Sequence, residues 1–437
     1  MSSEEPELYG APSAESLYEE TVENYRRFLN PPLARVMKLS GSPLESSAQG
    51  SIIVDHTGKT YLDFAGGYGV FTVGHRHPRV VAAVKRQLDL IALSGKTMFN
   101  PLQGRLARRL AEIAPGDLEI SFFSNSGAEA VEGSVKLARA ATGRSTIVAT
   151  HNAFHGKTVG ALSASGREAF QTAFRPLLAD VVHVAFGDAS VLDRALTDAA
   201  CFIVEPVQGE GGVVVPPEGY LRAARAACDR SGALFIADEV QTGLGRCGAL
   251  FACNSDGVVP DVMALAKGLS GGVVPIGAYI ARPNVWNAAY GKAPLVHTST
   301  FGGSELACAA ALAALDVLRD EDLVENARSR GEQLIAGARR IGEAFPDVIA
   351  DVRGRGLLVG VELRSEGYVG TIVPEMLKDG VTVAWTLNQQ RVLRLEPPLI
   401  VTEGEVEVAL AALERAVRVA FERFGALAEA QPAGGRP

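Results

Sequence analysis

The chain has little of several features that mark other classes of protein. Only five of its 437 residues are cysteine and no C-x-x-C pair occurs, so we expect reduced thiols rather than a disulfide framework. No window approaches the roughly 20 consecutive apolar residues that a bilayer span requires. The first ten residues, MSSEEPELYG, lack the basic and apolar regions of a secretory signal. These absences predict a cytoplasmic protein with no membrane partner.

Positive charge is also scarce, since the net charge is −8. Binding to a phosphate backbone needs lysine and arginine concentrated on one face, so nucleic acid is not an expected partner. The glycines of GGYG at 66–69 do not match G-x-G-x-x-G, and no G-x-S-x-G segment occurs. His75 and His77 in GHRHP have no further ligand pattern around them, which favours turn histidines over a metal site.

What the chain does contain is a long alternation of short apolar runs and helix-length segments. The predicted strands are SFF at 121, STIVAT at 145, VVHVAF at 181, CFIVEP at 201, LFIAD at 234, VMALA at 262 and PIGAYIA at 275. This alternation is typical of parallel βαβ units covered on both faces. The fold class is therefore α/β, with a mainly parallel, doubly wound sheet.

Three domain-level regions follow from the rest of the pattern. Residues 1–60 form an N-terminal arm, with a helix from 14 to 28 that stops at Asn30-Pro31-Pro32, and a hairpin in which SIIVD and TYLDF flank HTGK. Residues 61–320 form the large domain. Residues 321–437 form a small α+β domain with LLVGVEL, VTVAW and VLRLEP as strands and AEAQPAGGRP as a frayed tail. We expect the arm and hairpin to join the small domain.

Three of the predicted strands end in chemically useful groups. Asp238 follows LFIA, Lys267 follows VMALA, and the turn of Ser126, Gly127 and Ala128 follows SFF. In open α/β sheets ligands bind beyond the carboxyl ends of the strands, so these groups share one rim. An acid for a ring nitrogen, an amine for an aldehyde and a helix N-terminus for a phosphate together indicate pyridoxal phosphate. Burial would also free the lysine amine for Schiff-base chemistry.

Each group has a purely structural alternative. Asp238 could be a helix N-cap, and a lone lysine at a strand end is usually a solvated charge. Ser126 with Glu129 is a capping box, S-x-x-E, that needs no phosphate. Three residues after Asp238, Gln241 could hydrogen-bond a phenolic oxygen on the ring. The cofactor is favoured because the segments occur together, and the phosphate segment is the weakest of them.

Eight segments occur in the order found in class III, or ω-type, aminotransferases, and the chain resembles this family from about residue 50 to 405. They are GHRHP, SNSGAEA, AFHGKT, EPVQGEGGV, ADEVQTGLGR, ALAKGLSGG, HTSTFGG and RLEPPL. FLNPP, FACNSDGVVPDV and VAWTLNQQRVLRLEPPL resemble the putrescine aminotransferase group within the family. The resemblance implies the fold type I of pyridoxal phosphate enzymes and a homodimer with shared active sites.

The resemblance also implies roles for individual residues. Lys267 would form the Schiff base with the cofactor and move the proton, and Asp238 would contact the pyridine nitrogen. Phe154 would stack on the ring with His155 beside it, Gly127 and Ala128 would hold the phosphate, and Thr300 would reach the neighbouring subunit's phosphate. The remaining cofactor-binding residues predicted from the matching motifs are Ser126, Glu205 and Gln241.

On the substrate side, the resemblance pairs Glu210 with Arg394 as a gate. Paired, the guanidinium is masked and an amine can enter; released, it can bind the carboxylate of a 2-oxo acid bidentately. A permanent structural salt bridge is the alternative. Tyr68 of GGYG and Lys96 of SGKTMFNP are the other predicted substrate residues.

The chain departs from the family in two places. Lys96 stands where the putrescine group has a neutral polar residue, and a cation there would repel the distal ammonium of a diamine. Ser304-Glu305 replaces the usual Asn-Pro. The expected substrate is therefore a primary amine or ω-amino compound, or the matching aldehyde, with diamine, amino sugar, secondary-metabolite aldehyde and ω-amino acid all open.

The predicted activity is transamination between this substrate and a 2-oxo acid by a ping-pong mechanism. An aminomutase or racemase of the same fold, or a catalytically silent cofactor binder, is the alternative.

Overall fold

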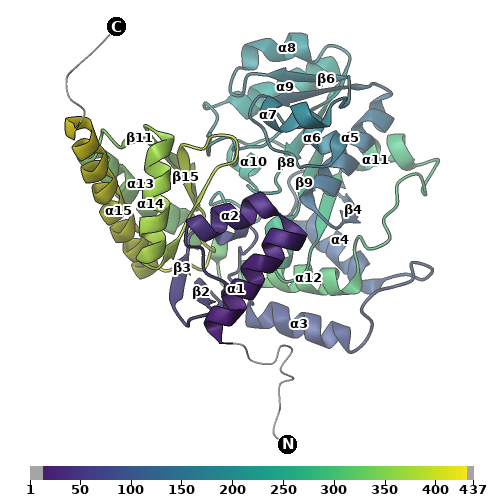
Figure 1. The fold of residues 1–437 in the computed structure, drawn as a ribbon. Coiled ribbons are helices and arrows are strands. Elements are labelled where there is room, and N and C mark those ends of the chain that lie inside the picture. Colours follow the sequence, from purple (N-terminus) through teal and green to yellow (C-terminus); the bar gives the residue numbers. More distant parts are fainter. Residues whose placement is uncertain (1–12, 431–437) are drawn as a thin grey trace, which may run out of the picture.

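The structure is a computed structural model that describes residues 13–430, with side chains described as far as residue 424. The acidic first ten residues lie outside this range. Of the predicted tail AEAQPAGGRP, residues 428–430 still belong to the last helix, and the others lie outside the described residues. Figure 1 shows two lobes, with the N-terminal helices lying across the front of the molecule between them.

The larger lobe is built on a seven-stranded sheet with the order β4-β10-β9-β8-β7-β5-β6. Every strand was predicted from the sequence, within a few residues at each end. The strands are β4 Ile120–Ser124, β5 Thr146–Thr150, β6 Val181–Val184, β7 Ala199–Val204, β8 Leu234–Asp238, β9 Val262–Leu265 and β10 Gly277–Ala281. The predicted α/β class with a mainly parallel sheet is confirmed.

One strand of this sheet departs from parallel order. β10 pairs antiparallel with both β4 and β9. Parallel neighbours need a long crossover, usually a helix, whereas antiparallel neighbours can be joined by a short connection. Between β9 and β10 the chain has only a single turn of 3-10 helix, η5 (Lys267–Ser270), and a short loop. Because two reversals restore the direction, β4 runs parallel to β8 and β9, and all three carboxyl ends meet at one rim.

Helices cover both faces of the sheet because its strands are apolar on both sides. On one face α5 and α11 pack against residues such as Ile203, Ile236 and Ala264; on the other, α3, α4, α9 and α12 pack around Phe202, Phe235 and Leu265. The helices of this lobe are α3 Pro78–Leu88, α4 Pro101–Ile113, α5 Gly127–Thr142, α6 Val159–Ala164, α7 Glu168–Gln171, α8 Leu192–Ala195, α9 Tyr220–Ser231, α10 Ala252–Ser255, α11 Pro283–Tyr290 and α12 Glu305–Asp320.

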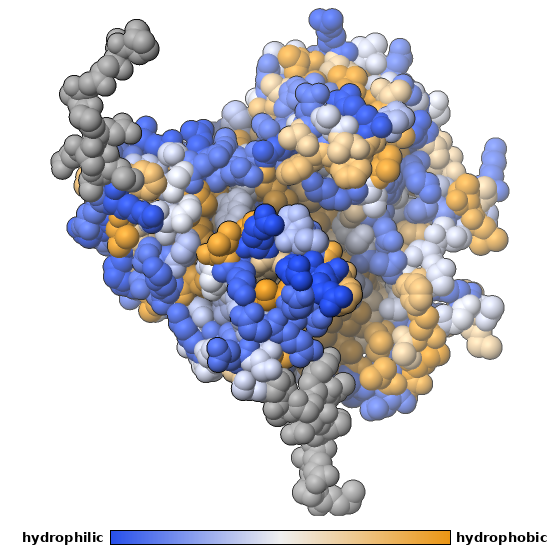
Figure 2. All heavy atoms as spheres, viewed as in Figure 1, coloured by the Kyte–Doolittle hydropathy of each residue, from blue (hydrophilic) through white to orange (hydrophobic). Residues whose placement is uncertain are grey.

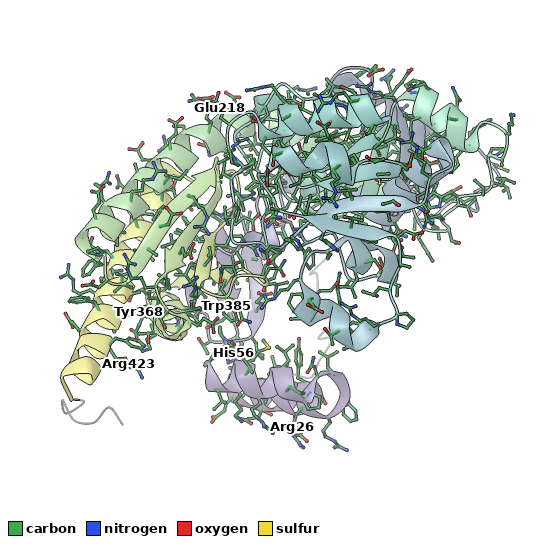
Figure 3. All side chains as sticks on the ribbon, turned by 90° about the horizontal axis from the view of Figure 1, so that it is seen from above. Arg26, His56, Glu218, Tyr368, Trp385 and Arg423 are labelled. Atoms are coloured by element: carbon green, nitrogen blue, oxygen red, sulfur yellow. The ribbon has the colours of Figure 1, made fainter. Side chains whose placement is uncertain are left out.

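The smaller lobe contains an antiparallel sheet of order β11-β12-β15-β14 with helices packed against it. Its strands are β11 Ile349–Arg355, β12 Leu358–Leu363, β14 Ala384–Trp385 and β15 Val392–Leu395, and its helices are α13 Leu323–Ala344, α14 Glu366–Lys378 and α15 Glu403–Ala430. Figure 3 shows Tyr368 on α14 and Arg423 on α15 at the outer side of this lobe. The α+β character predicted for this part of the chain is confirmed, although β11 was missed.

The N-terminal hairpin joins the C-terminal part of the chain through a third sheet. β1 (Glu45–Gln49), β2 (Ile52–Asp55) and β3 (Thr60–Asp63) form an antiparallel ribbon, and β13 (Val381–Thr382) adds to β3 in parallel. The hairpin was predicted, but β1 was not, because ESSAQ has almost no apolar residues. The domain limits at residues 60 and 320 stay a prediction.

The N-terminal arm contains one more helix than the sequence predicts. Helix α1 (Ala14–Asn24) continues as a π-helical turn, Tyr25–Leu29, and ends at Asn30 as predicted. A further helix, α2 (Pro31–Leu39), then begins at the two prolines, with Asn30 Oδ1 accepting from the Leu33 N–H. Proline is tolerated in the first turn of a helix because its missing N–H has no partner there. Over the described residues, no helix has the length and apolar character that crossing a membrane requires.

Candidate active site

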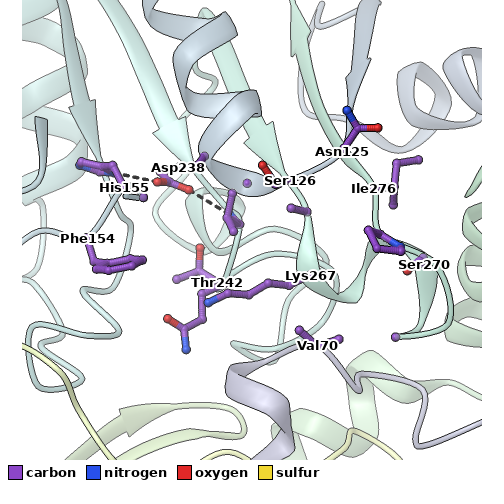
Figure 4. Close-up of a pocket in the computed structure, with 18 of the residues that line it drawn as sticks. Val70, Asn125, Ser126, Phe154, His155, Asp238, Thr242, Lys267, Ser270 and Ile276 are labelled. Atoms are coloured by element: carbon purple, nitrogen blue, oxygen red, sulfur yellow. Dashed lines mark hydrogen bonds and ion pairs between the residues drawn. The ribbon is translucent and has the colours of Figure 1, made fainter. Parts of the chain in front are cut away.

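The carboxyl ends of β4, β8 and β9 border a cavity of about 620 Å³. Figure 4 shows side chains from these strand ends converging on it. The predicted site residues that line the cavity are Ser126, Gly127, Ala128, Phe154, His155, Glu205, Asp238, Gln241 and Lys267. The prediction that three separate strand ends share one rim is therefore confirmed.

Lys267 lies two residues beyond the end of β9 and begins η5. Its φ is +45°, a left-handed conformation that is rare for a residue with a side chain. Burial lowers the pKa of Lys267, against the opposite effect of the Glu396 carboxylate. A strained backbone and an amine that loses its proton easily are both common at functional sites. The amine is therefore suited to nucleophilic attack on a carbonyl.

Asp238 ends β8 and is 97% buried, with 3% of its surface exposed. Its Oδ2 lies 2.7 Å from His155 Nδ1, and its Oδ1 accepts from the Val240 N–H at 3.1 Å. Burial lowers the pKa of His155, but the hydrogen bond and charge of Asp238 outweigh it and the net shift is upward. His155 Nε2 has no hydrogen-bond partner among residues 13–430. The histidine therefore holds the carboxylate that faces the cavity.

Glu205 supports the segment that carries Phe154. Its carboxylate accepts from the backbone N–H of Phe154 at 3.0 Å and of Gly209 at 3.2 Å. Burial raises the pKa of Glu205 to about 7. The position of the Phe154 ring against the cavity thus depends on a carboxyl group from the end of the neighbouring strand β7.

The N-terminus of α5 points into the same cavity. Ser126 Oγ accepts from the Glu129 N–H at 3.2 Å, as the predicted capping box requires, but the Glu129 carboxylate returns to the Asn125 N–H and not to Ser126. The first N–H groups of a helix have no partner within it, so those of Gly127 and Ala128 can receive an anion. A Cβ on Gly127 would lie 2.8 Å from Val240 Cγ1, so glycine allows the start of α5 to pack closely against Val240.

Gln241 lines the cavity and also contacts a buried carboxylate, that of Glu396. Its Nε2 donates to both carboxylate oxygens of Glu396 at 3.0 Å. The predicted bond to a phenolic oxygen on the cofactor ring stays a prediction. Neither Glu396 nor its contact with Gln241 was found from the sequence.

The predicted partners Glu210 and Arg394 form a buried ion pair. Arg394 Nη1 lies 2.6 Å from Glu210 Oε1, and Glu210 Oε2 accepts from the Leu387 N–H at 2.7 Å. The ring of Tyr68, which is 54% exposed, lies over the guanidinium with its centroid 5.3 Å from Cζ. These three residues do not line the cavity directly; they connect to it through Glu396 and Gln241.

Two predicted residues, Lys96 and Thr300, lie outside this cavity. Both are exposed, and Lys96 Nζ donates to the Gly302 carbonyl at 2.5 Å. The loop that carries Lys96 is also fixed by Glu305, whose Oε2 accepts from the Ser94 N–H at 2.8 Å. Any effect of Lys96 on a diamine therefore requires a cavity formed with a second subunit.

Several lining residues escaped sequence reasoning because each is ordinary by itself. Val240 is an apolar residue inside ADEVQTGLGR, and the other residues follow strands without a distinctive pattern. These are Val70, Asn125, Gly156, Val240, Thr242, Ala266, Ser270 and residues 272–276.

The GHRHP histidines each contact a carboxylate. His75 Nε2 lies 2.8 Å from Asp63 Oδ2, and His77 is the N-cap of α3 and lies 3.1 Å from Glu321 Oε1. The described part of the chain holds no group of three or more potential metal ligands close together.

The residues of the cavity fit pyridoxal phosphate. Asp238 would supply a buried carboxylate for the ring nitrogen, Lys267 an amine for the aldehyde, and α5 an N-terminus for the phosphate. His155 Nε2, one of the buried polar atoms without a partner in the described residues, lies in the same group. The sequence and the geometry of the cavity therefore both indicate pyridoxal phosphate.

Comparisons with known proteins agree with this reading. Residues 43–417 match the family model for class-III aminotransferases. The chain is 45% identical over 406 residues to a putrescine aminotransferase of Pectobacterium atrosepticum, covering 89% of this chain and 86% of that protein. It is 33% identical to an ornithine aminotransferase structure from Toxoplasma gondii ME49, covering 95% and 97% of the two chains with a TM-score of 0.86.

A third relative is an amine transaminase from an uncultivated Pseudomonas species, whose structure is in the PLP-bound form. This relative is 31% identical, with a TM-score of 0.81 over 87% of this chain and 95% of that one. Aminomutases and silent binders are not favoured by these similarities. The chain belongs to the class III aminotransferase family and is a transaminase that uses pyridoxal phosphate.

Proposed function

We propose that this transaminase moves the amino group of an aliphatic amine without an α-carboxylate, such as a diamine or ω-amino compound, to a 2-oxo acid. The observation that carries the proposal is the buried Arg394–Glu210 pair. Because Glu210 neutralises the guanidinium, an uncharged carbon chain can lie beside it. The relative named as a putrescine aminotransferase supports the same substrate class.

On the cofactor side, each residue has a separate task. Pyridoxal phosphate, when bound, withdraws electrons from the carbon that carries the amino group. Asp238 would keep the ring nitrogen protonated, and His155 holds Asp238 in place. Lys267 would take the proton from that carbon and return it, since its lowered pKa makes the free amine available.

Phe154, held through its N–H by Glu205, would cover one face of the ring. Gly127 and Ala128 would bind the phosphate through backbone N–H groups, and Ser126 supports them by capping the helix. Gln241 would contact the ring's phenolic oxygen. These groups orient the cofactor and remain in place through both half-reactions.

On the substrate side, the two half-reactions need different charges. An amine donor fits while Glu210 masks Arg394. When a 2-oxo acid enters, its carboxylate would replace Glu210 on the guanidinium, which can bind it through two parallel hydrogen bonds. Tyr68, stacked on Arg394, would stay beside the aliphatic part of either substrate.

We also propose a homodimer in which Thr300 and Lys96 act at the partner's cavity. Large apolar side chains are exposed around both residues: Leu90, Met98, Phe99, Leu295, Val296 and Phe301. Figure 2 shows hydrophobic residues gathered at the lower right, where the end of α3 and the following loop lie in Figure 1. Exposed apolar patches of this kind mark interaction surfaces. A cytoplasmic location and a role in amine metabolism stay predictions.

The test is a spectrophotometric screen of amine donors against the purified holoenzyme, one half-reaction at a time. Diamines and ω-amines should convert the aldehyde form of the cofactor to the amine form, and a 2-oxo acid should reverse the change. If only α-amino acids react, the proposed substrate class is wrong. If no 2-oxo acid restores the aldehyde form, the enzyme does not work by transfer to an oxo acid.

A further inference from the structure

A second buried carboxylate, Glu396, holds Arg394 from a different side than Glu210 does. Glu396 Oε2 lies 3.1 Å from Arg394 Nε, and its Oε1 lies 3.7 Å from Nε of another buried arginine, Arg246. Arg394, Arg246 and Glu396 are all fully buried, with 0% of their surface exposed. Two cations and the carboxylates of Glu210 and Glu396 thus balance one another inside the protein.

The position of Glu396 is fixed by its surroundings. Its backbone N–H donates to the Phe64 carbonyl at 2.8 Å. The GGYG segment packs directly against it, since a Cβ on Gly66 would lie 1.9 Å from the Glu396 carbonyl oxygen and one on Gly69 2.7 Å from Oε1. Both glycines also have positive φ, +56° and +92°. Side chains at these positions would displace Glu396.

The hydrogen-bond donors of Arg394 are therefore divided between two kinds of partner. Nε faces Glu396, and Nη1 faces Glu210 at 2.6 Å. Nη2 is buried and has no hydrogen-bond partner in the described part of the chain, and Nε, although it forms an ion pair with Glu396, makes no hydrogen bond there either. A buried donor without a partner is costly unless a ligand or water satisfies it. Because Nε faces the buried Glu396 carboxylate, the Nη1 and Nη2 edge is the one at which partners can be exchanged.

We propose that Glu396 is a positioning residue that anchors Arg394 through Nε, so that Glu210 and the carboxylate of the 2-oxo acid alternate on the Nη1 and Nη2 edge. This inference rests on the proposed function. While the outer carboxylate changes, the inner one keeps the guanidinium in one orientation. Because Glu396 also accepts from Gln241, the same carboxylate links the orientation of Arg394 to the wall of the cofactor cavity.

Glu396→Gln removes the charge and retains the size of the side chain. With one of its two ion-pair partners made neutral, the guanidinium is held less firmly, and we expect the KM for the 2-oxo acid to rise about tenfold. The KM for the amine donor should stay within about threefold, because Glu210 remains on Arg394 in that half-reaction. A general loss of folding would lower the yield of active enzyme, but it would not raise the KM for one substrate and leave the KM for the other unchanged.

The matched control is Glu362→Gln. Glu362 is a half-buried carboxylate on β12 that pairs with Arg353 and Arg391, and it lies opposite Val392 on the strand next to it. The same substitution there removes charge from the same sheet outside the site. Both KM values of this control should match the wild-type enzyme.

Binding without turnover gives a second readout. Glutarate has carboxylates but no keto or amino group that could react, so calorimetry on the holoenzyme measures its affinity directly. Glu396→Gln should weaken glutarate about tenfold, and Glu362→Gln should not change it. If Glu396→Gln does not fold, Arg246→Met combined with Glu396→Gln removes one cation and one anion together, and the same weakening is expected.

The proposal is overturned if the Glu396 variants bind glutarate within twofold of wild type, if the Glu362 control weakens it equally, or if wild type shows no saturable binding. A wild-type enzyme that uses a 2-oxo acid while Glu396→Gln leaves its KM unchanged rejects only the role of Glu396. A wild-type enzyme that uses no 2-oxo acid rejects the proposed function itself.

Discussion

On the cofactor side of the cavity, Lys267, Asp238 and the N-terminus of α5 each follow directly from the end of a strand. On the substrate side, Glu210, Arg394 and Glu396 come from distant segments and hold one another by charge. The first group is positioned by backbone geometry, and we expect it to keep its arrangement through both half-reactions. The second is a balanced set of buried charges, which can change partners because each has more than one.

The two sides also differ in the energetic cost of a substitution. Removing one member of a buried charge set leaves an uncompensated charge, while the backbone geometry of the cofactor side survives a side-chain change. Substitutions on the cofactor side should therefore lower kcat with little discrimination between substrates. Those on the substrate side should separate the amine from the 2-oxo acid.

The largest expected effect is that of Lys267→Ala. Loss of the amine removes both the covalent link to the cofactor and the proton-transferring group, so kcat should fall by roughly a thousandfold or more. Absorbance and borohydride reduction followed by mass spectrometry measure the link. Lys85→Ala, an exposed lysine on α3, is the control. Full turnover by Lys267→Ala would remove this lysine from the mechanism.

Asp238→Asn should reduce kcat by about a hundredfold for both half-reactions, because a neutral amide cannot keep the ring nitrogen protonated. The cofactor should still bind. The pKa of His155 should also fall, since the carboxylate that raises it is gone. Stopped-flow rates and NMR titration of the histidine test the two parts. If kcat fell in only one half-reaction, the proposed difference between the cofactor side and the substrate side would be wrong.

Glu205 gives the cofactor side a pH-dependent stability. Its pKa is raised by burial to about 7, so the folded protein holds a proton that the unfolded chain releases above its ordinary value of 4.5. From this group the free energy of unfolding should fall by on the order of 3 kcal/mol as pH rises from about 4.5 to 7. Urea unfolding at several pH values should show this decline in wild type and its loss in Glu205→Gln. If the free energy of unfolding depends on pH in the same way in both proteins, this prediction is wrong.

Arg394→Lys tests the substrate side. Lysine keeps a positive charge but cannot bind a carboxylate through two parallel hydrogen bonds, so the KM for the 2-oxo acid should rise about tenfold or more. The amine half-reaction should change by only a few fold. Steady-state kinetics with each substrate varied separately measure the split. A parallel loss in both would mean that the Arg394–Glu210 pair is purely structural.

The smallest expected effect is that of Lys96→Gln, which sharpens the question of the second subunit. Removing a cation about 4 Å or more from a diamine's ammonium is worth at most about 1 kcal/mol in water, or roughly fivefold in KM. The improvement should appear for diamines and not for monoamines, and it should shrink as salt is added. No change would remove Lys96 from the substrate site.

The sequence by itself determined the fold class, the strands of the main sheet and the cofactor side. Asp238, Lys267 and Ser126 were legible because each follows an apolar run, and in an open α/β sheet the ends of such runs converge. Local patterns also identified α1 and the hairpin. They missed β1 and α2, where polar residues and prolines hide a regular element.

Only the tertiary structure decided how Glu396 joins the substrate side. Arg394 lies on β15 and Glu396 directly follows it, but nothing local shows that Gln241 and Arg246 meet Glu396, because those contacts span more than a hundred residues. The pairing of Glu210 with Arg394 was expected only from the family resemblance. The structure also placed Lys96 and Thr300 outside the chain's own cavity. Ion pairs between distant segments depend on how the lobes pack, and this packing leaves no periodic signal in the sequence.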